Sequence, residues 1–133
     1  MIPKILVADD DFDNRTIVQQ ALEAAGYAVV TATNSEEALE RVASETPQVL
    51  LLDLSMPKMN GWEVAKRLRE NPAYDAMPII AFTAHALVGE ELKAKAAGCD
   101  DYISKPCLPK DVVAKLAYWI QSSSDAAAME TAP

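Results

Sequence analysis

The hydrophobic pattern divides the chain into five short segments rich in apolar and β-branched residues, separated by longer stretches of mixed character. Several of these segments are apolar at consecutive positions, which is typical of strands in a parallel sheet that is buried on both faces. The pattern therefore predicts five buried strands, at residues 4–8 (KILVA), 28–32 (AVVTA), 48–52 (QVLLL), 78–82 (PIIAF) and 101–104 (DYIS).

Apolar residues recur at helical spacing between the predicted strands. After the first strand, Val18, Ala21, Leu22 and Ala25 lie at positions i, i+3, i+4 and i+7, and Gly26 follows at the place of a C-terminal cap. Inward-facing residues of three later helices are predicted at Ala38, Leu39 and Val42; at Val64, Ala65 and Leu68; and at Val113, Leu116, Ala117 and Ile120.

Polar residues mark where two of the later helices begin. Asn34 and Asn60 are each followed three positions on by a glutamate, close to the capping-box pattern. The stretch 85–98 is the weakest helix prediction because Gly89 lies in its first turn and no continuous apolar stripe follows. We therefore expect that helix to be the most mobile element.

The alternation of strand and helix sets the fold class. Five repeats of strand then helix, with connections too long for hairpins, predict a doubly wound α/β fold with right-handed crossovers. We expect a flavodoxin-like, five-stranded parallel sheet in the order 2-1-3-4-5, with helices on both faces. In such sheets functional groups gather outside the carboxyl ends of the strands, where the winding reverses and strands 1 and 3 lie side by side.

Length and composition bound the number of domains. At 133 residues, half of them hydrophobic, the chain is long enough for one domain with a core and too short for two ordinary ones. We place that domain at residues 1–121. The last segment, 122–133 (SSSDAAAMETAP), is small and polar with no periodicity, so we expect a disordered tail or the start of a linker.

Charge and cysteine content narrow the classes of partner and compartment. Twenty acidic against twelve basic residues give a net charge of −8, which disfavours nucleic acids and anionic membranes and favours proteins or cations. No apolar stretch reaches about eighteen residues and no leader precedes a cleavage site, so we expect a cytoplasmic protein. Cys99 and Cys107 lack CxxC spacing and a histidine cluster, and are interpreted as small hydrophobic residues.

Acidic residues crowd the ends of two predicted strands. Asp9 and Asp10 end the first strand and Asp53 ends the third, so we expect their carboxylates to meet in one pocket. Three converging carboxylates raise one another's pKa unless a cation lies among them. Mg²⁺ takes oxygen ligands and suits one or two carboxylates plus a phosphate, so the acids predict a magnesium site. Asp11 instead lies where the first helix starts and is interpreted as its N-cap.

Two further polar residues follow strand ends. Thr83 comes after the fourth strand and Lys105 after the fifth, which places a hydroxyl and a cation on the same rim. Together with the acids they predict phosphoryl transfer to a carboxylate, in which positioning and fixed positive charge do most of the catalysis. Asp53 is the candidate nucleophile, and Lys105 and Thr83 would each bind a phosphoryl oxygen.

Four stretches of the chain resemble, in order and spacing, the receiver domain of bacterial two-component response regulators: ILVADDD, LLLDLSMPKMNGWE, IIAFTAHA and GCDDYISKP. The resemblance covers about residues 4–120. It implies these roles: Asp9, Asp10 and Asp53 as Mg²⁺ ligands together with a backbone carbonyl of Ser55, Asp53 as phosphoacceptor, Thr83 as switch hydroxyl and Lys105 as phosphoryl partner.

The resemblance also implies how the switch works. When the hydroxyl of Thr83 moves toward the phosphoryl group, the family turns an aromatic ring inward, and here that position is Tyr102. The fourth helix, the fifth strand and the last helix would form the surface that changes with phosphorylation. His85 occupies a position that tunes phosphoryl lifetime in the family, and the bond before Pro106 is expected to be cis.

A receiver domain is a phosphoacceptor regulator rather than a conventional turnover enzyme. By resemblance, its partners are a histidine kinase or a histidine phosphotransfer protein and a downstream protein target. The acidic net charge leads us to expect neither nucleic acid nor membrane among them. The chain could be a single-domain regulator like those of chemotaxis or a fragment of a longer regulator or hybrid kinase, and the sequence leaves both open.

Three other interpretations compete with this one. An EF-hand starting at Asp9 fails because its sixth loop position is Asn14 and its twelfth is Gln20. A phosphatase with an aspartyl nucleophile shares the metal and carboxylate chemistry, but the chain has no spare residues for the cap domain such enzymes commonly carry. A receiver-like scaffold that works without phosphorylation is disfavoured because no pocket position is missing.

Overall fold

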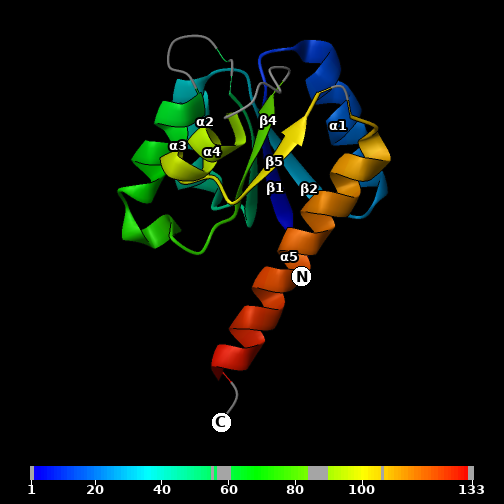
Figure 1. Ribbon diagram of the computed structural model, residues 1–133. Coiled ribbons are helices and arrows are strands. Elements are labelled where there is room, and N and C mark those ends of the chain that lie inside the picture. Colours follow the sequence, from blue (N-terminus) through cyan, green and yellow to red (C-terminus); the bar gives the residue numbers. More distant parts are fainter. Residues whose placement is uncertain (1, 55, 57–60, 84–89, 106, 132–133) are drawn as a thin grey trace.

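The computed structural model describes residues 2–54, 56, 61–83, 90–105 and 107–131, in which strands and helices alternate along the chain (Figure 1). In these ranges the strands are β1 (Lys4–Ala8), β2 (Ala28–Ala32), β3 (Val49–Asp53), β4 (Ile79–Thr83) and β5 (Asp101–Ser104). The helices are α1 (Phe12–Ala24), α2 (Ser35–Glu45), α3 (Gly61–Arg69), the short 3-10 helix η1 (Pro72–Tyr74), α4 (Glu90–Ala97) and α5 (Pro109–Thr131).

The strands form one parallel sheet in the order β2-β1-β3-β4-β5, as predicted. The observed bounds of β3 and β4 lie one residue later than the predicted ones, because Asp53 pairs with Phe82 and Thr83 pairs with Ser104 in the ladder. The candidate nucleophile and the candidate hydroxyl are thus the last residues of two neighbouring strands.

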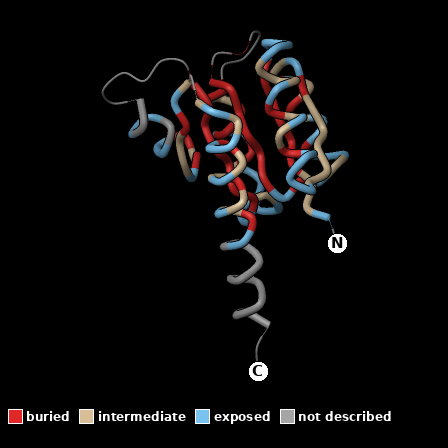
Figure 2. Tube along the Cα trace, turned by 90° about the vertical axis from the view of Figure 1, so that its right-hand side faces the viewer, coloured by how far each residue is buried: buried red, intermediate tan, exposed pale blue. Residues whose placement is uncertain are grey.

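Helices cover both faces of the sheet, with α1 and α5 on one side and α2, α3 and α4 on the other (Figure 1). Side chains alternate between the two layers along each strand. In β1, Ile5 and Val7 belong to the core cluster with α1 and α5, whereas Leu6 and Ala8 belong to the cluster with α2 and α3. Both faces of the strand are therefore buried, which explains the consecutive apolar positions and the buried central strands in Figure 2.

Polar side chains cap the first two helices at their predicted starts. The carboxylate of Asp11 accepts a hydrogen bond from the N–H three residues on (3.0 Å), and Asn34 does the same at the start of α2 (2.9 Å). Gly26 follows α1 with φ of +98°, the left-handed conformation that glycine adopts at no steric cost. The cap predicted at Asn60 lies outside the described residues.

The guanidinium of Arg69, at the end of α3, binds several groups at the end of the sheet where β4 and β5 begin, opposite the candidate site. It donates to the carbonyls of Gly98 (2.9 Å), Tyr74 (2.8 Å) and Met77 (2.9 Å), and to the carboxylate of Asp100 (2.6 Å). One side chain thereby ties α3 to η1 and to the segments that precede β4 and β5.

The last two helices bear on two of the sequence-based expectations. In the described part of the chain α4 begins at Glu90, one residue after the glycine that weakens its pattern; its predicted mobility stays a prediction. The helix α5 runs to Thr131 and projects away from the sheet (Figure 1), and the expectation that residues 122–133 are a disordered tail or the start of a linker stays a prediction. Alanine, methionine and glutamate in this stretch are strong helix formers, which a search for apolar periodicity overlooks. The predicted domain end at 121 stays a prediction.

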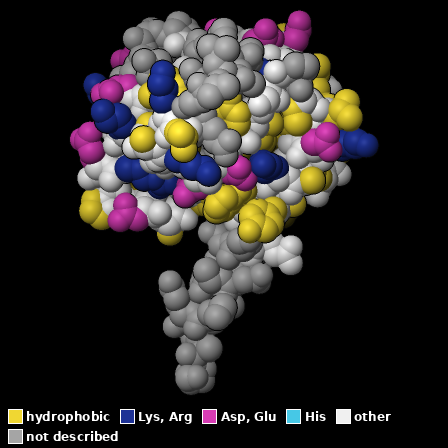
Figure 3. Space-filling view, in the orientation of Figure 1, with side chains coloured by type: hydrophobic (Ala, Val, Ile, Leu, Met, Phe, Trp, Pro, Cys, Tyr) yellow, Lys and Arg dark blue, Asp and Glu magenta, His cyan; other side chains and the backbone are white. Residues whose placement is uncertain are grey.

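The surface carries both signs of charge despite the acidic composition. On the face drawn in Figure 3, Lys and Arg side chains lie between acidic and apolar ones. Within the described residues, no helix combines the length and the apolar character that crossing a bilayer requires.

Candidate metal centre

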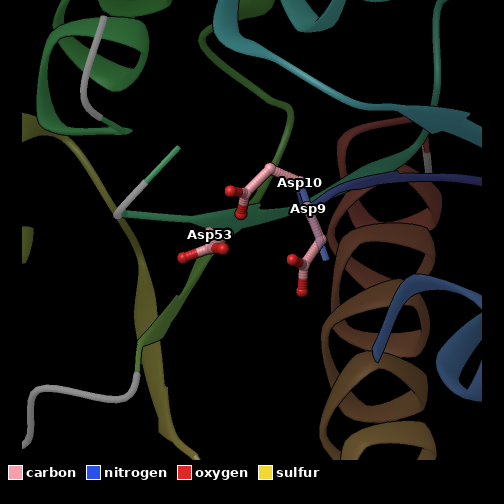
Figure 4. A group of neighbouring side chains, drawn as sticks. All are labelled: Asp9, Asp10 and Asp53. Carbon is pink, nitrogen blue, oxygen red and sulfur yellow. The ribbon is translucent and has the colours of Figure 1, made fainter. Parts of the chain in front are cut away.

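Three carboxylates meet at the carboxyl ends of β1 and β3. Asp9 and Asp10 follow the last residue of β1, and Asp53 is the last residue of β3, its neighbour in the sheet. One carboxylate oxygen from each side chain lies within 4.8 Å of the other two. Figure 4 shows the carboxylate of Asp10 turned toward Asp53, with Asp9 beside them. The predicted convergence of these acids is confirmed.

Burial makes this cluster electrostatically costly. Asp9 and Asp53 are 1% and 2% exposed, whereas Asp10 lies at the surface. Loss of water raises the pKa of Asp9, and the charge of Asp53 adds to that, while the N–H of Asp11 (2.9 Å) and the ammonium of Lys105 oppose it. The pKa of Asp10 is raised by partial burial and then by hydrogen bonding and charge repulsion with Asp53. The acids therefore resist full ionisation unless positive charge is supplied.

Lys105 supplies part of that charge. Its Nζ lies 3.1 Å from Oδ2 of Asp9 and 3.4 Å from Oδ2 of Asp53, and its side chain is 13% exposed. Its backbone N–H donates to the carbonyl of Thr83 (2.7 Å), which holds the start of the β5–α5 connection against the end of β4. One ammonium cannot balance three carboxylates, so the cluster keeps a negative charge that favours a cation.

The donor set fits a hard divalent ion. Mg²⁺ is bound in proteins through one or two carboxylates and keeps several waters, and it does not require nitrogen or sulfur ligands. Asp9, Asp10 and Asp53 offer three carboxylates, two of them buried and one at the surface where water reaches it. The cluster could therefore bind Mg²⁺ while one side stays open to solvent and substrate.

Thr83 lies on the same rim. It is the last residue of β4, is 1% exposed, and pairs with Ser104 of β5. The parallel register brings β4 beside β3, so the threonine follows the residue that pairs with Asp53. The sheet thus brings together the acids, Thr83 and Lys105, as predicted from their positions at strand ends.

Other predicted residues lie elsewhere or outside the described ranges. Tyr102 is half-buried on β5 and packs against the core cluster on the α2–α3–α4 side. Ser55, His85 and Pro106 lie outside the described residues, so their predicted roles and the cis bond stay predictions. Cys99 is a free thiol whose pKa is raised to about 12 by burial, in keeping with its interpretation as a small hydrophobic residue.

Sequence reasoning missed three residues that support the site. Arg15 donates through Nη1 to the carbonyl of Asp9 (2.9 Å), and its position one turn into α1 was the available signal. The ring of Phe82 lies against the Lys105 ammonium, with Nζ 4.8 Å from the ring centroid. Phe82 comes directly before Thr83 on the strand beside β3, and this position indicates that it lies near the site. The position alone does not indicate the contact with Lys105.

Gly61 is the third missed residue. Its N–H donates to the carbonyl of Leu54 (3.0 Å), so the chain returns at the start of α3 to the segment that follows β3. A Cβ at this position would lie 2.6 Å from Cα of Leu54 and 2.8 Å from the carbonyl oxygen of Asp53. Only glycine allows this close approach to the backbone of the candidate nucleophile.

Comparison with known proteins points to one family. Residues 5–117 match the response regulator receiver domain. The chain is 38% identical over 127 residues to the alkaline phosphatase synthesis transcriptional regulatory protein PhoP of Bacillus subtilis, covering 96% of this chain and 52% of that protein. It likewise spans about half the length of several other curated relatives, among them the response regulator MprA of Mycobacterium ulcerans.

Two solved structures share the fold over nearly their whole length. A CheY-like response regulator receiver domain protein from Methanospirillum hungatei is 28% identical with a TM-score of 0.88, covering 95% of this chain and 99% of that one. The BeF3-activated receiver domain of DrrB is 29% identical with a TM-score of 0.81, covering 91% and 99%. The family match, the sheet order and the acidic pocket agree, and this chain belongs to the response regulator receiver domain family.

Proposed function

We propose that the chain is a phosphorylation-dependent signalling switch that accepts a phosphoryl group on Asp53. Receiver domains are phosphoacceptor regulators rather than turnover enzymes, and histidine kinases are their partners. The observation that carries the proposal is that Asp53 is buried at a strand end, 3.4 Å from the Lys105 ammonium and within 4.8 Å of two further carboxylates. The fold thus places the carboxylate of Asp53 between the positive charge of Lys105 and the acids that would bind a cation.

The donor would be a phosphohistidine of a histidine kinase or of a phosphotransfer protein. A carboxylate oxygen of Asp53 attacks phosphorus, a new P–O bond forms, and the P–N bond to the imidazole breaks. The electron pair of that bond stays on the imidazole nitrogen. Lys105 binds one phosphoryl oxygen and the hydroxyl of Thr83 donates to another, so that fixed groups stabilise the charge that spreads over the transferring group.

Mg²⁺ is the cofactor that this site would take, held by Asp9, Asp10 and Asp53, with a backbone carbonyl from Ser55 by family resemblance. When bound, it neutralises charge on the phosphoryl oxygens. A phosphoryl group adds about 1.5 to 2 negative charges, which a cluster of three carboxylates and one ammonium would otherwise repel.

The switch would use Thr83 and Tyr102. Thr83 pairs with Ser104 of β5 and lies two positions after Ala81, the residue that pairs with Tyr102, so a shift of the threonine toward Asp53 would displace its partners on β5. Tyr102 is half-buried at the side of the sheet where α4 packs. We infer that α4, β5 and α5 form the surface that a downstream protein recognises, either as a separate partner or as another part of a longer regulator.

One experiment tests the acceptor and the metal together. The protein is treated with acetyl phosphate and Mg²⁺, and its intact mass is followed, with Asp53→Asn and added chelator as the two negative arms. Asp13→Asn is the matched control, since Asp13 is an exposed acid in the first turn of α1. We expect one phosphoryl adduct on the wild type and on Asp13→Asn and none in the negative arms. Labelling that survives loss of Asp53 would refute the assignment, and steady turnover of unrelated phosphate esters would favour a phosphatase.

A further inference from the structure

Phe82 touches the charged group of the site although it belongs to the hydrophobic core. The residue is 5% exposed and lies in the apolar cluster between the sheet and helices α1 and α5. The register pairs it with Asp53 on β3 and with Ile103 on β5. Its ring centroid lies 4.8 Å from Nζ of Lys105, within the distance at which the negative face of an aromatic ring attracts a cation.

The surroundings of the Lys105 ammonium strengthen its attraction to the ring of Phe82. The side chain of Lys105 is 13% exposed, so the charge has lost most of its water. Two carboxylates meet it at 3.1 and 3.4 Å, and the ring supplies a further favourable surface. A lysine ammonium is a point charge on a flexible four-carbon stem, so its position depends on the groups around it. An aliphatic residue at position 82 would fill the space without attracting the charge.

We propose that Phe82 is a positioning residue that holds the Lys105 ammonium between Asp9 and Asp53 through the face of its ring. The proposal deepens the proposed function and rests on it for its catalytic consequence, because a well-placed ammonium binds the incoming phosphoryl oxygen without first reorganising. The alternative is that Phe82 serves only to fill the core, in which case its shape matters and its ring electrons do not.

The first test does not require phosphorylation. Unfolding of the wild type, Phe82→Leu, Lys105→Met and the double variant is measured in metal-free buffer as a double-mutant cycle. If the ring attracts the ammonium, the double variant should have a folding equilibrium constant about threefold or more above the product of the two single effects. The reason is that once one partner has been replaced, replacing the other removes no further ring–ammonium interaction. If the effects of the two single substitutions on the folding equilibrium constant simply multiply in the double variant, the attraction between ring and ammonium is refuted. This conclusion does not depend on whether the wild type reacts with acetyl phosphate.

The second test separates ring electrons from ring shape. The chain has two phenylalanines, so global replacement of phenylalanine by mono-, di- and trifluorophenylalanine in a Phe12→Leu background alters only position 82. Fluorine weakens the negative face of the ring while nearly keeping its size. We expect the rate of phosphorylation by acetyl phosphate to fall stepwise with fluorine number, by about threefold to tenfold overall, with unchanged mass yield at saturation.

The outcomes of the two tests are distinct. A rate that does not depend on fluorine number would refute the positioning role, as would a drop that appears only with Phe82→Leu. A wild-type chain that takes no phosphoryl group at all would refute the proposed function instead, and the double-mutant cycle would still decide whether the ring holds the ammonium.

Discussion

Replacing Lys105 by methionine removes the described cation that contacts both buried carboxylates, and we expect a large loss of stability that Mg²⁺ largely restores. The ammonium lies 3.1 Å from Asp9 and 3.4 Å from Asp53, which are 1% and 2% exposed. Methionine keeps most of the volume and the apolar stem, so the substitution tests the charge. The unpaired acids then face each other in a site from which most water is excluded.

The size of the loss follows from these distances. At an effective dielectric near 20, each ion pair at this separation attracts with about 5 kcal/mol before the desolvation of the ammonium is subtracted. Truncating one partner of a buried pair costs about 3–5 kcal/mol. Protonation limits the loss, because neutralising a carboxyl of ordinary pKa at pH 7 costs about 4 kcal/mol. We therefore expect the free energy of unfolding to fall by about 3–4 kcal/mol.

Urea unfolding at pH 7 in chelator and in saturating Mg²⁺ measures this effect. Lys4→Met is the matched control, because Lys4 also pairs with a carboxylate, that of Glu45 at 3.0 Å, but the two side chains are 37% and 31% exposed. The control should lose no more than about 1 kcal/mol and should not respond to Mg²⁺. Equal losses in the two variants, or a loss at Lys105 that Mg²⁺ leaves unchanged, would refute the electrostatic account of the pocket.

Burial raises the pKa of Asp9 and Asp10, so protons compete with Mg²⁺ for these carboxylates at a higher pH than they would at ordinary carboxyls. Calorimetric titration should therefore show the affinity of the protein for Mg²⁺ falling as the pH drops. A Mg²⁺ affinity that does not depend on pH would contradict this. Without metal, the stability contributed by Asp9 is present below the ordinary pKa of 3.8 and is lost as pH rises through its raised value, so Asp9→Asn should flatten the pH dependence of the unfolding free energy. Gly61→Ala should lower stability by about 1–3 kcal/mol, because the new Cβ meets backbone; an unchanged urea midpoint would disprove that steric argument. Arg69→Met should lower the free energy of unfolding by about 2–4 kcal/mol, because the carbonyls and the carboxylate that Arg69 binds lose their donor. Replacement of the exposed Arg67 by methionine should change that free energy by no more than about 0.5 kcal/mol. Similar losses in the two variants would rule out the role of Arg69 in holding α3 to the sheet.

The sheet order and the meeting of the acids could be predicted from sequence because both depend on periodic rules. Consecutive apolar residues identify strands buried on two faces, and parallel connection places every carboxyl end at one edge. Asp9, Asp53, Thr83 and Lys105 each occupy such an end, so their convergence needs only the strand order.

The supporting contacts could not be predicted because they depend on side-chain direction and backbone clearance. Phe82 reads as an ordinary strand residue until the placement of the Lys105 side chain is known. Gly61 reads as a loop glycine until the backbone beside Asp53 is seen to leave no room for a Cβ. The helical course of α5 beyond residue 121 has no apolar period from which it could be predicted, although alanine, methionine and glutamate in that stretch favour a helix.

The ion pair between Asp9 and Lys105 joins residues 96 positions apart, and this separation bears on synthesis. During synthesis the first carboxylates, Asp9 and Asp10, are made early, but the ammonium of Lys105 that partly neutralises the cluster is added only after β5, the last of the five described strands. Until then the nascent chain carries its acids without their intramolecular counter-charge. Under the proposed function, a growing chain would therefore have no working acceptor for a kinase until Lys105 has been synthesised.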